Sequence, residues 1–198
     1  SRHSLRYGGA CPGSTEIVCK DFGDTDVETW QNCTGVTQRV YWVQSGWSTD
    51  DGNFTLSWNV VAGTCPIPPV NDDCNAAIGL TVNADYNCGV VTSGTVEASS
   101  GSPDPTSETC GGTADDDVWY SFVATGTAHR VELTNVSGFT DMYHSVYAEG
   151  GGCPTLGAEI ICNDGNTSNL TGLTAGDTYY VRVYTWTSTT GQTATFDV

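Results

Sequence analysis

The chain has 198 residues, and its 6 Lys and Arg residues against 23 Asp and Glu residues give a formal net charge of −17 at pH 7. A protein that binds nucleic acid or docks on anionic lipid needs a basic surface, so this charge argues against both kinds of partner. No apolar run approaches the ~20 residues that a membrane-spanning helix needs, and we therefore expect no membrane insertion.

The composition favours strands over helices. The chain contains 24 Gly, 9 Tyr and 6 Trp but only 1 Met, and Thr and Val are frequent. Aromatic and β-branched side chains suit the pleated, half-buried surface of a sheet, while Gly, Asn, Asp and Pro supply the turns between strands. We therefore expect an all-β protein.

Alternating apolar and polar residues predict four strands in the first third of the chain. They lie near residues 4–7, 15–19, 37–44 and 54–60. Four such strands expose one apolar face and at least two edges, and open edges invite pairing with another chain. Two arrangements would cover them. Either the missing strands belong to a longer precursor, which is the simpler assumption, or a neighbouring molecule supplies them by strand addition.

A Pro-rich segment, residues 65–69, is expected to be a stiff linker to the rest of the chain. Beyond it, alternation predicts strands near residues 77–82, 88–97, 117–124, 128–135, 143–148, 158–162, 178–186 and 192–198. A helical turn is expected at 74–77, and residues 163–177 are expected to form a polar loop anchored by Leu170 and Leu173. Short strands separated by Gly, Asn and Asp turns indicate a two-sheet β-sandwich of the jelly-roll type.

The two parts of the chain resemble each other. Residues 4–64 match residues 145–198 in the same order with short gaps, most clearly 16–21 against 159–164 and 52–60 against 191–198. An internal repeat of this kind indicates that one structural unit occurs more than once. We therefore interpret residues 70–198 as one complete repeat and residues 1–64 as the back half of another.

Three motifs carry a resemblance to a known family. Residues 71–78, 117–122 and 173–183 together resemble the pre-peptidase C-terminal domain, a jelly-roll module appended to secreted bacterial proteases and collagenases. The cysteine-bearing version is similar to repeats in surface proteins and adhesins of Bacteroidetes that are exported by type IX secretion. The resemblance implies a secreted or cell-surface protein, but it implies no particular activity, because fold does not fix function.

The resemblance also implies a calcium site. Matching positions are Asn71 and Asp72 at the start of the complete repeat, and Asp115 and Asp117 just before a strand. Calcium prefers carboxylate, amide and carbonyl oxygens, and adjacent acidic residues repel one another unless a cation bridges them. The alternative is a solvated acidic turn.

The 9 cysteines form no C-x-x-C pair, so we do not expect a zinc ribbon. We expect instead a disulfide framework formed in an oxidising compartment. Cys11 with Cys19 and Cys153 with Cys162 occupy equivalent places in the two repeats and flank a turn, which predicts two hairpin disulfides. The further expectations are a Cys88–Cys110 bond, a Cys65–Cys74 bond, and Cys33 as the odd thiol.

Aromatic residues form a candidate ligand face. Tyr184 and Trp186 end one predicted strand, and Trp42 and Trp47 lie in the equivalent region of the first repeat. Flat aromatic faces suit stacking on sugar rings or peptide. The alternative is that about half of these aromatic side chains face the core, because side chains alternate along a strand. We also expect Trp58 and Phe196 to lie in the core.

No catalytic motif is present: His3, His129 and His144 stand in no recognisable pattern, and neither G-x-S-x-G nor H-E-x-x-H occurs. We therefore expect a non-enzymatic extracellular repeat module for adhesion or for assembly of a surface filament, with neighbouring repeats or head-to-tail copies as partners. The alternative is an ancillary module of a secreted hydrolase that binds polysaccharide or fibrous protein. A third reading is a structural spacer, which the charge would keep soluble.

Overall fold

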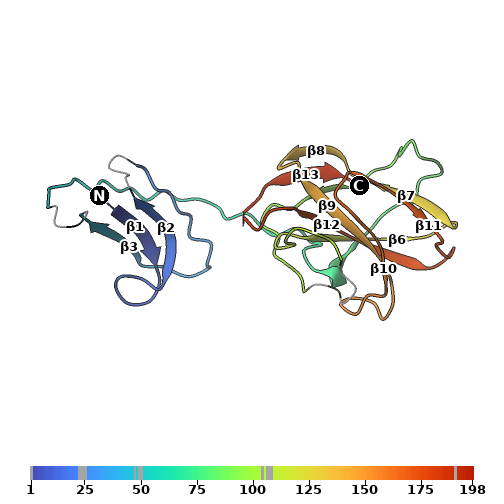
Figure 1. The fold of residues 1–198 in the computed structure, drawn as a ribbon, viewed down its shortest axis with the longest axis horizontal. Helices are drawn as coiled ribbons and strands as arrows, with labels where there is room; N and C mark the ends of the chain where they lie inside the picture. The colour runs from blue at the N-terminus through green and yellow to red at the C-terminus, as the bar shows by residue number, and fades with distance from the viewer. Residues whose placement is uncertain are drawn as a thin grey trace. The chain divides into compact units, whose positions relative to one another are not determined.

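The computed structural model describes residues 2–21, 26–46, 48, 51–103, 105, 109–189 and 191–198. The chain forms two compact units, Ser1–Cys65 (unit 1) and Pro66–Val198 (unit 2), each built of strands (Figure 1). The all-β expectation is therefore confirmed. Among the predicted ligand residues, Trp47 lies outside the described part of the chain.

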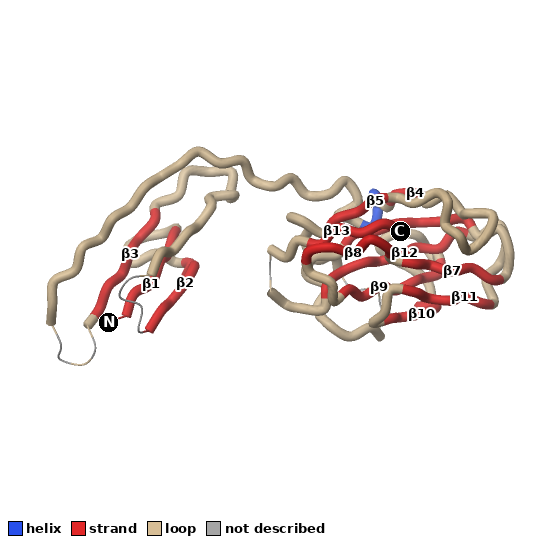
Figure 2. Tube along the Cα trace, turned by 90° about the horizontal axis from the view of Figure 1, so that it is seen from above, coloured by secondary structure: helices blue, strands red, loops and turns tan. Residues whose placement is uncertain are grey.

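Unit 1 contains one antiparallel sheet. Its strands are β1 (Arg2–Tyr7), β2 (Thr15–Asp21) and β3 (Val40–Ser45), in the order β2-β1-β3 (Figure 2). The strand predicted at 54–60 is wrong, because these residues have no ladder partner among the described residues. Its apolar side chains remain in solvent: the exposed fractions of Leu56, Trp58 and Val60 are 43%, 80% and 80%. Trp58 is therefore not a core residue.

The main sheet of unit 2 has five strands, in the order β10-β9-β12-β6-β4. Their bounds are β4 (Ile78–Gly79), β6 (Val118–Val123), β9 (Met142–Ala148), β10 (Glu159–Asn163) and β12 (Thr178–Thr185). β4 runs parallel to β6, and the other pairs are antiparallel. The 3-10 turn η1 (Cys74–Ala76) precedes β4, as the sequence predicts.

The second layer of unit 2 consists of two smaller sheets. One has the order β5-β13-β8, from β5 (Ser93–Thr95), β13 (Ala194–Asp197) and β8 (Thr134–Gly138). The other pairs β11 (Thr167–Thr171) with β7 (Ala128–Glu132). Sequence patterns missed β8 and β11. β11 lies inside the predicted polar loop, whose anchors Leu170 and Leu173 are buried as expected.

The core of unit 2 lies between these layers. Alternate side chains of β6 and β12 point into it, and they meet Ala194 and Phe196 of β13 and Leu170 of β11. This packing makes unit 2 a β-sandwich; its jelly-roll connectivity stays a prediction. The opposite face of the main sheet is also buried, because Trp119 and Tyr147 pack against Cys74 and Leu156.

The cysteines pair differently from the predictions. The structure contains Cys33–Cys65, Cys74–Cys153 and Cys110–Cys162 disulfides, whereas Cys11, Cys19 and Cys88 are free. The Cys11–Cys19, Cys153–Cys162, Cys88–Cys110 and Cys65–Cys74 bonds are therefore absent, and Cys33 is not the odd thiol.

The sheet register explains why the hairpin bonds do not form. Cys162 lies opposite Ser145, three residues beyond the first ladder residue of β10, Glu159. At ~3.3 Å per residue, this places it about 10 Å along the strand from the β9–β10 connection that contains Cys153. A disulfide needs Cα atoms within about 7 Å. The same separation applies to Cys11 and Cys19 of unit 1. Cys19 lies opposite Ser4, several residues along β2 from the β1–β2 connection that contains Cys11.

The sheet of unit 1 has the same strand order and antiparallel pairing as β10-β9-β12 of unit 2. The paired residues correspond as well, since the Ser4–Cys19 pair matches the Ser145–Cys162 pair. These are the segments that resemble each other in sequence. Their common topology agrees with an internal repeat; the half-repeat organisation itself stays a prediction.

Candidate functional site

A buried ion pair lies on the outer face of the main sheet of unit 2. Arg182 of β12 stands opposite Trp119 of β6 in the ladder, and its Nε donates to Asp117 Oδ2 over 2.8 Å. Both side chains are fully buried. The guanidinium lies 5.3 Å from the Trp119 ring centroid and 5.5 Å from that of Tyr184. A charge this deeply buried is stable only when it is paired and hydrogen-bonded, so the pair fixes local geometry.

The adjacent carboxylates of Asp116 and Asp117 hydrogen-bond to β12 and to the loop between β5 and β6. Asp116 accepts hydrogen bonds from the Thr185 N–H over 3.0 Å and from its hydroxyl over 2.7 Å. Asp117 Oδ1 accepts from the Ser102 N–H over 2.6 Å. Burial raises the pKa of Asp116 and of Asp117 above the ordinary carboxyl range, and hydrogen bonds from Thr185 oppose the rise at Asp116. At Asp117 the Arg182 charge is the main opposing influence.

The loop between β5 and β6 is held over the end of β12 at several points. The Cys110–Cys162 disulfide joins it to β10. The Tyr184 hydroxyl donates to the Gly111 carbonyl over 2.8 Å, and the Thr113 N–H donates to the Trp186 carbonyl over 3.3 Å. Gly112 has a φ of +79°, and a Cβ there would lie 3.0 Å from the Trp186 carbonyl oxygen, so glycine is required at this close approach.

A cavity of about 320 Å³ lies between this loop and the sheet. Its lining comes from Gly101, Ser102, residues 110–115, Arg182 and Tyr184. The volume falls at the lower end of the range typical of small-ligand pockets, ~300–1,000 Å³. Asp115 lines this cavity, and its Oδ1 is buried without a hydrogen-bond partner in the described part of the chain. A buried acceptor of this kind costs free energy unless a ligand, water or ion satisfies it.

An aromatic row runs beside the cavity. Tyr143 of β9 stacks on Tyr184 with 5.8 Å between ring centroids and on Trp186 with 5.3 Å between them. A Cβ on Gly111, which lines the cavity, would lie 3.0 Å from the Trp186 ring, so this indole contacts the cavity wall. Trp186 is 46% exposed, whereas Tyr184 and Tyr143 are buried. The row therefore ends in a partly exposed indole that is held by Tyr143.

Comparison with known proteins identifies the family. A family profile described as galactose binding domain-like, and associated with type IX secretion, matches residues 70–198. The chain belongs to this galactose-binding-domain-like family. The match supports the expected β-sandwich module of type IX-secreted proteins, while the closer resemblance to the pre-peptidase C-terminal domain stays a prediction. A search of curated proteins finds no match to the chain.

Two of the predicted ligand residues lie together in the galactose-binding-like domain. Tyr184 lines the cavity, and Trp186 contacts its wall. Trp42 lies in unit 1, where its ring stacks on His3. Sequence reasoning missed Arg182 and Tyr143. The available signal for Arg182 was its position as the lone cation in an otherwise apolar and aromatic strand, which predicts a buried partner.

The predicted calcium ligands of the domain are largely engaged by protein groups. Asn71 donates its amide to the Trp119 carbonyl over 2.8 Å, and Asp72 accepts from the Ser100 N–H over 2.6 Å and from its hydroxyl over 2.9 Å. Asp117 is paired with Arg182. In the described residues, Asp72, Asp115 and Asp117 do not form a group whose oxygens all lie within 4.8 Å of one another. Among these predicted ligands, only Asp115 has a buried side-chain oxygen without a hydrogen-bond partner in the described residues.

The described part of the chain contains no helix with the length and apolar character needed to cross a membrane.

Proposed function

We propose that unit 2 is a carbohydrate-binding module of an extracellular surface protein, and that it serves adhesion without catalysing a reaction. The observation that carries this proposal is a cavity lined by Asp115, whose wall contacts the partly exposed indole of Trp186. Membership of a galactose-binding-like family associated with type IX secretion supports it. Three disulfides support a location outside the cell, because they persist in oxidising compartments.

The chemistry of the cavity suits a sugar ring. A pyranose has a flat C–H face that packs on an aromatic ring and hydroxyl groups that donate hydrogen bonds to a carboxylate. Trp186 would supply the first contact and Asp115 the second. Because Trp186 stacks on Tyr143, its ring is already held in place, and binding loses less side-chain entropy than it would with a free indole.

The test is binding of galactose-terminated glycans by the full chain. A glycan array selects the best glycan, and isothermal titration with that glycan measures the affinity with calcium and with excess chelator. We expect Trp186→Ala and Asp115→Asn each to weaken binding at least tenfold. The matched control is Trp58→Ala, which removes an exposed indole from unit 1 and should leave binding unchanged.

Two results would overturn the proposal: no galactose-terminated glycan binds, or both cavity variants bind as well as the unaltered chain. Binding of fibrous collagen instead, abolished by the same variants, would favour the alternative role as a module for fibrous protein. We also propose that Asp115 binds calcium. This proposal requires that the chelator weakens glycan binding and that Asp115→Asn removes the effect of the chelator.

A second candidate role is assembly through unit 1. Leu56, Trp58 and Val60 alternate along an extended segment that resembles β13, yet they are exposed, whereas Ala194 and Phe196 of β13 are buried between β5 and β8. Contiguous exposed apolar surface marks interaction sites. We propose that a second copy covers this segment, because the chain itself carries strands of the β5 and β8 type.

This role predicts that the full chain self-associates at micromolar concentration, as measured by sedimentation velocity. Trp58→Ser combined with Leu56→Ser should convert the oligomer to a monomer, and Trp186→Ser is the matched control on unit 2. A monodisperse monomer of the unaltered chain would refute assembly between copies.

A further inference from the structure

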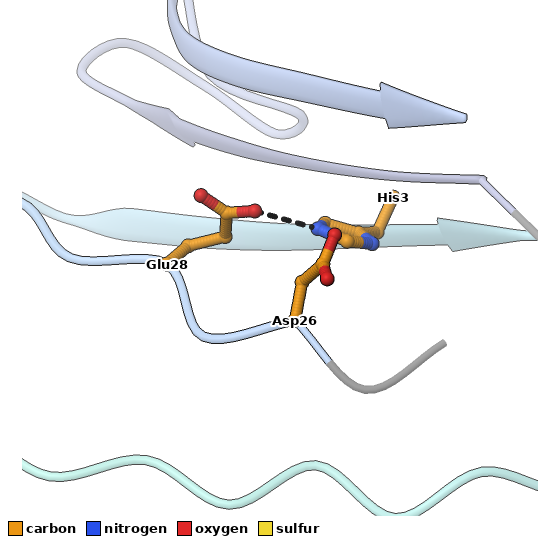
Figure 3. A group of neighbouring side chains, drawn as sticks. All are labelled: His3, Asp26 and Glu28. Atoms are coloured by element: carbon orange, nitrogen blue, oxygen red, sulfur yellow. Dashed lines mark hydrogen bonds and ion pairs between the residues drawn. The ribbon is translucent and has the colours of Figure 1, made fainter. Parts of the chain in front are cut away.

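Three side chains of unit 1 gather in one place that no sequence motif marks. His3 lies on β1, and Asp26 and Glu28 lie on the segment that follows β2 (Figure 3). The His3 Nε2 atom lies 3.2 Å from Glu28 Oε1. One ligand atom from each of the three residues lies within 4.8 Å of the other two. The His3 side chain is only 2% exposed and that of Glu28 12%, whereas Asp26 is at the surface.

Two alternating patterns bring this cluster together. His3 and Tyr7 point to the same face of β1, because side chains alternate along a strand. Glu28 and Trp30 are likewise two residues apart on the covering segment. Trp30 stacks on Tyr7 with 4.6 Å between ring centroids, while Glu28 meets His3. The segment is therefore held against the sheet at two points, and Asp26 follows the same alternation.

The orientation of the His3 ring is fixed by its neighbour. The ring stacks on the Trp42 indole with 4.5 Å between centroids and an interplanar angle of 13°. Stacking covers one face of the imidazole and leaves its nitrogens at the ring edge. Nε2 is thereby directed at Glu28, with the Asp26 carboxylate beside the ring (Figure 3). A ligand held by packing in this way loses little rotamer freedom when an ion binds.

We propose that His3, Asp26 and Glu28 bind one divalent transition-metal ion, of which Zn²⁺ is the best fit. Zinc takes imidazole nitrogen and carboxylate oxygen ligands at ~2.0–2.2 Å in tetrahedral geometry, so two ligand atoms stand about 3.3 Å apart. The His3–Glu28 separation of 3.2 Å matches this edge. Two carboxylates balance the charge of the ion, and three protein ligands leave a fourth position for water or a partner's ligand.

The competing arrangement is a simple ion pair between a protonated His3 and Glu28. This ion pair gives a partner to the Glu28 carboxylate but none to the Asp26 carboxylate. Lys20 lies opposite His3 in the β1–β2 ladder, yet the ion pairs of the described residues place neither Asp26 nor Glu28 against it. The site is in unit 1, so it is independent of the carbohydrate-binding proposal for unit 2.

The test is titration of the metal-free full chain with ZnCl₂ by calorimetry. Titration with Co²⁺ adds an electronic absorption spectrum that reports tetrahedral coordination. We expect one saturable site whose affinity falls at least tenfold in Asp26→Asn and in Glu28→Gln. Asp51→Asn removes an exposed acid of the same unit outside the cluster and should not change the affinity. Asp26 is exposed, so its variant keeps the fold, which circular dichroism verifies.

The free thiols need a separate control, because thiolates also bind zinc. Cys11→Ser combined with Cys19→Ser removes the two exposed thiols of unit 1, and the proposal requires that this variant keeps the site. Three outcomes overturn it: the chain binds no zinc, the serine variant loses the site, or Asp26→Asn and Glu28→Gln bind as tightly as Asp51→Asn.

Discussion

A buried histidine should make unit 2 sensitive to acid. His144 of β9 points into the sandwich, is fully buried, and its Nε2 lies 2.7 Å from the Ser168 hydroxyl of β11. Burial disfavours the charged imidazolium and lowers the pKa of His144 to about 4, below its usual 6.5. The residue therefore joins the two layers in its neutral form.

The magnitude follows from linkage. Below pH 6.5 the unfolded chain protonates His144, whereas the folded chain does so only near pH 4, so stability present at pH 7 is lost as the pH falls through this window. Because one pKa unit is worth about 1.36 kcal/mol, the complete loss is about 3 kcal/mol, and roughly 2 kcal/mol of it is gone at pH 4.5.

The assay is urea unfolding of the full chain at pH 7 and at pH 4.5. We expect His144→Gln to lower the free energy of unfolding at pH 7 through lost packing, but to remove about 2 kcal/mol of the fall between the two pH values. The raised pKa values of Asp116 and Asp117 act oppositely, because they favour the folded state as the pH falls; they are common to both proteins and cancel in the comparison. His129→Gln is the matched control. Equal falls in the unaltered chain and in His144→Gln would refute the reasoning.

Two further predictions concern the outer face of the main sheet. Asp117→Asn removes the carboxylate that pairs with the buried Arg182 Nε and should lower the free energy of unfolding by about 3–5 kcal/mol in urea titrations. Adding Arg182→Met should recover most of this loss, and a loss below about 1 kcal/mol would contradict the importance of the Asp117–Arg182 pair. Removing the disulfide with Cys110→Ala and Cys162→Ala should lower it by about 2–4 kcal/mol and increase amide hydrogen exchange around Gly111 more than at β13. Uniform exchange in both regions would contradict the role of the bond in holding the loop.

The strands of the main sheet were predictable because their pattern is strong. Residues 118–123 and 178–185 alternate between large apolar side chains on the core face and other residues on the opposite face, which is the signature of a half-buried strand. β8 and β11 carry the sequences Thr-Asn-Val-Ser-Gly and Thr-Ser-Asn-Leu-Thr, and polar side chains dominate both. Such strands form because neighbours pair with them, and a pattern within one segment carries no information about its neighbours.

The same distinction applies to the site. Tyr184 and Trp186 could be selected from sequence because aromatic residues at a strand end suit a ligand face. The partners of Asp117 could not, since Arg182 and Ser102 are 65 and 15 residues away from it. The disulfide predictions failed for a related reason. The predicted repeat matches Cys153 and Cys162 with Cys11 and Cys19, but long-range packing decides that Cys74 and Cys110 are the partners of Cys153 and Cys162.

The charge of the chain narrows the class of carbohydrate that the cavity would hold. The chain has a formal charge of −17, and the proposed sugar site is lined by the carboxyl group of Asp115. Long-range repulsion slows the approach of uronate-rich or sulfated polysaccharides, and a buried carboxylate facing another anion is strongly unfavourable. A neutral sugar meets neither obstacle, and in the proposed binding mode its hydroxyl groups would donate hydrogen bonds to Asp115 while its ring packs on Trp186. The carbohydrate-binding proposal therefore predicts selection of neutral over anionic glycans.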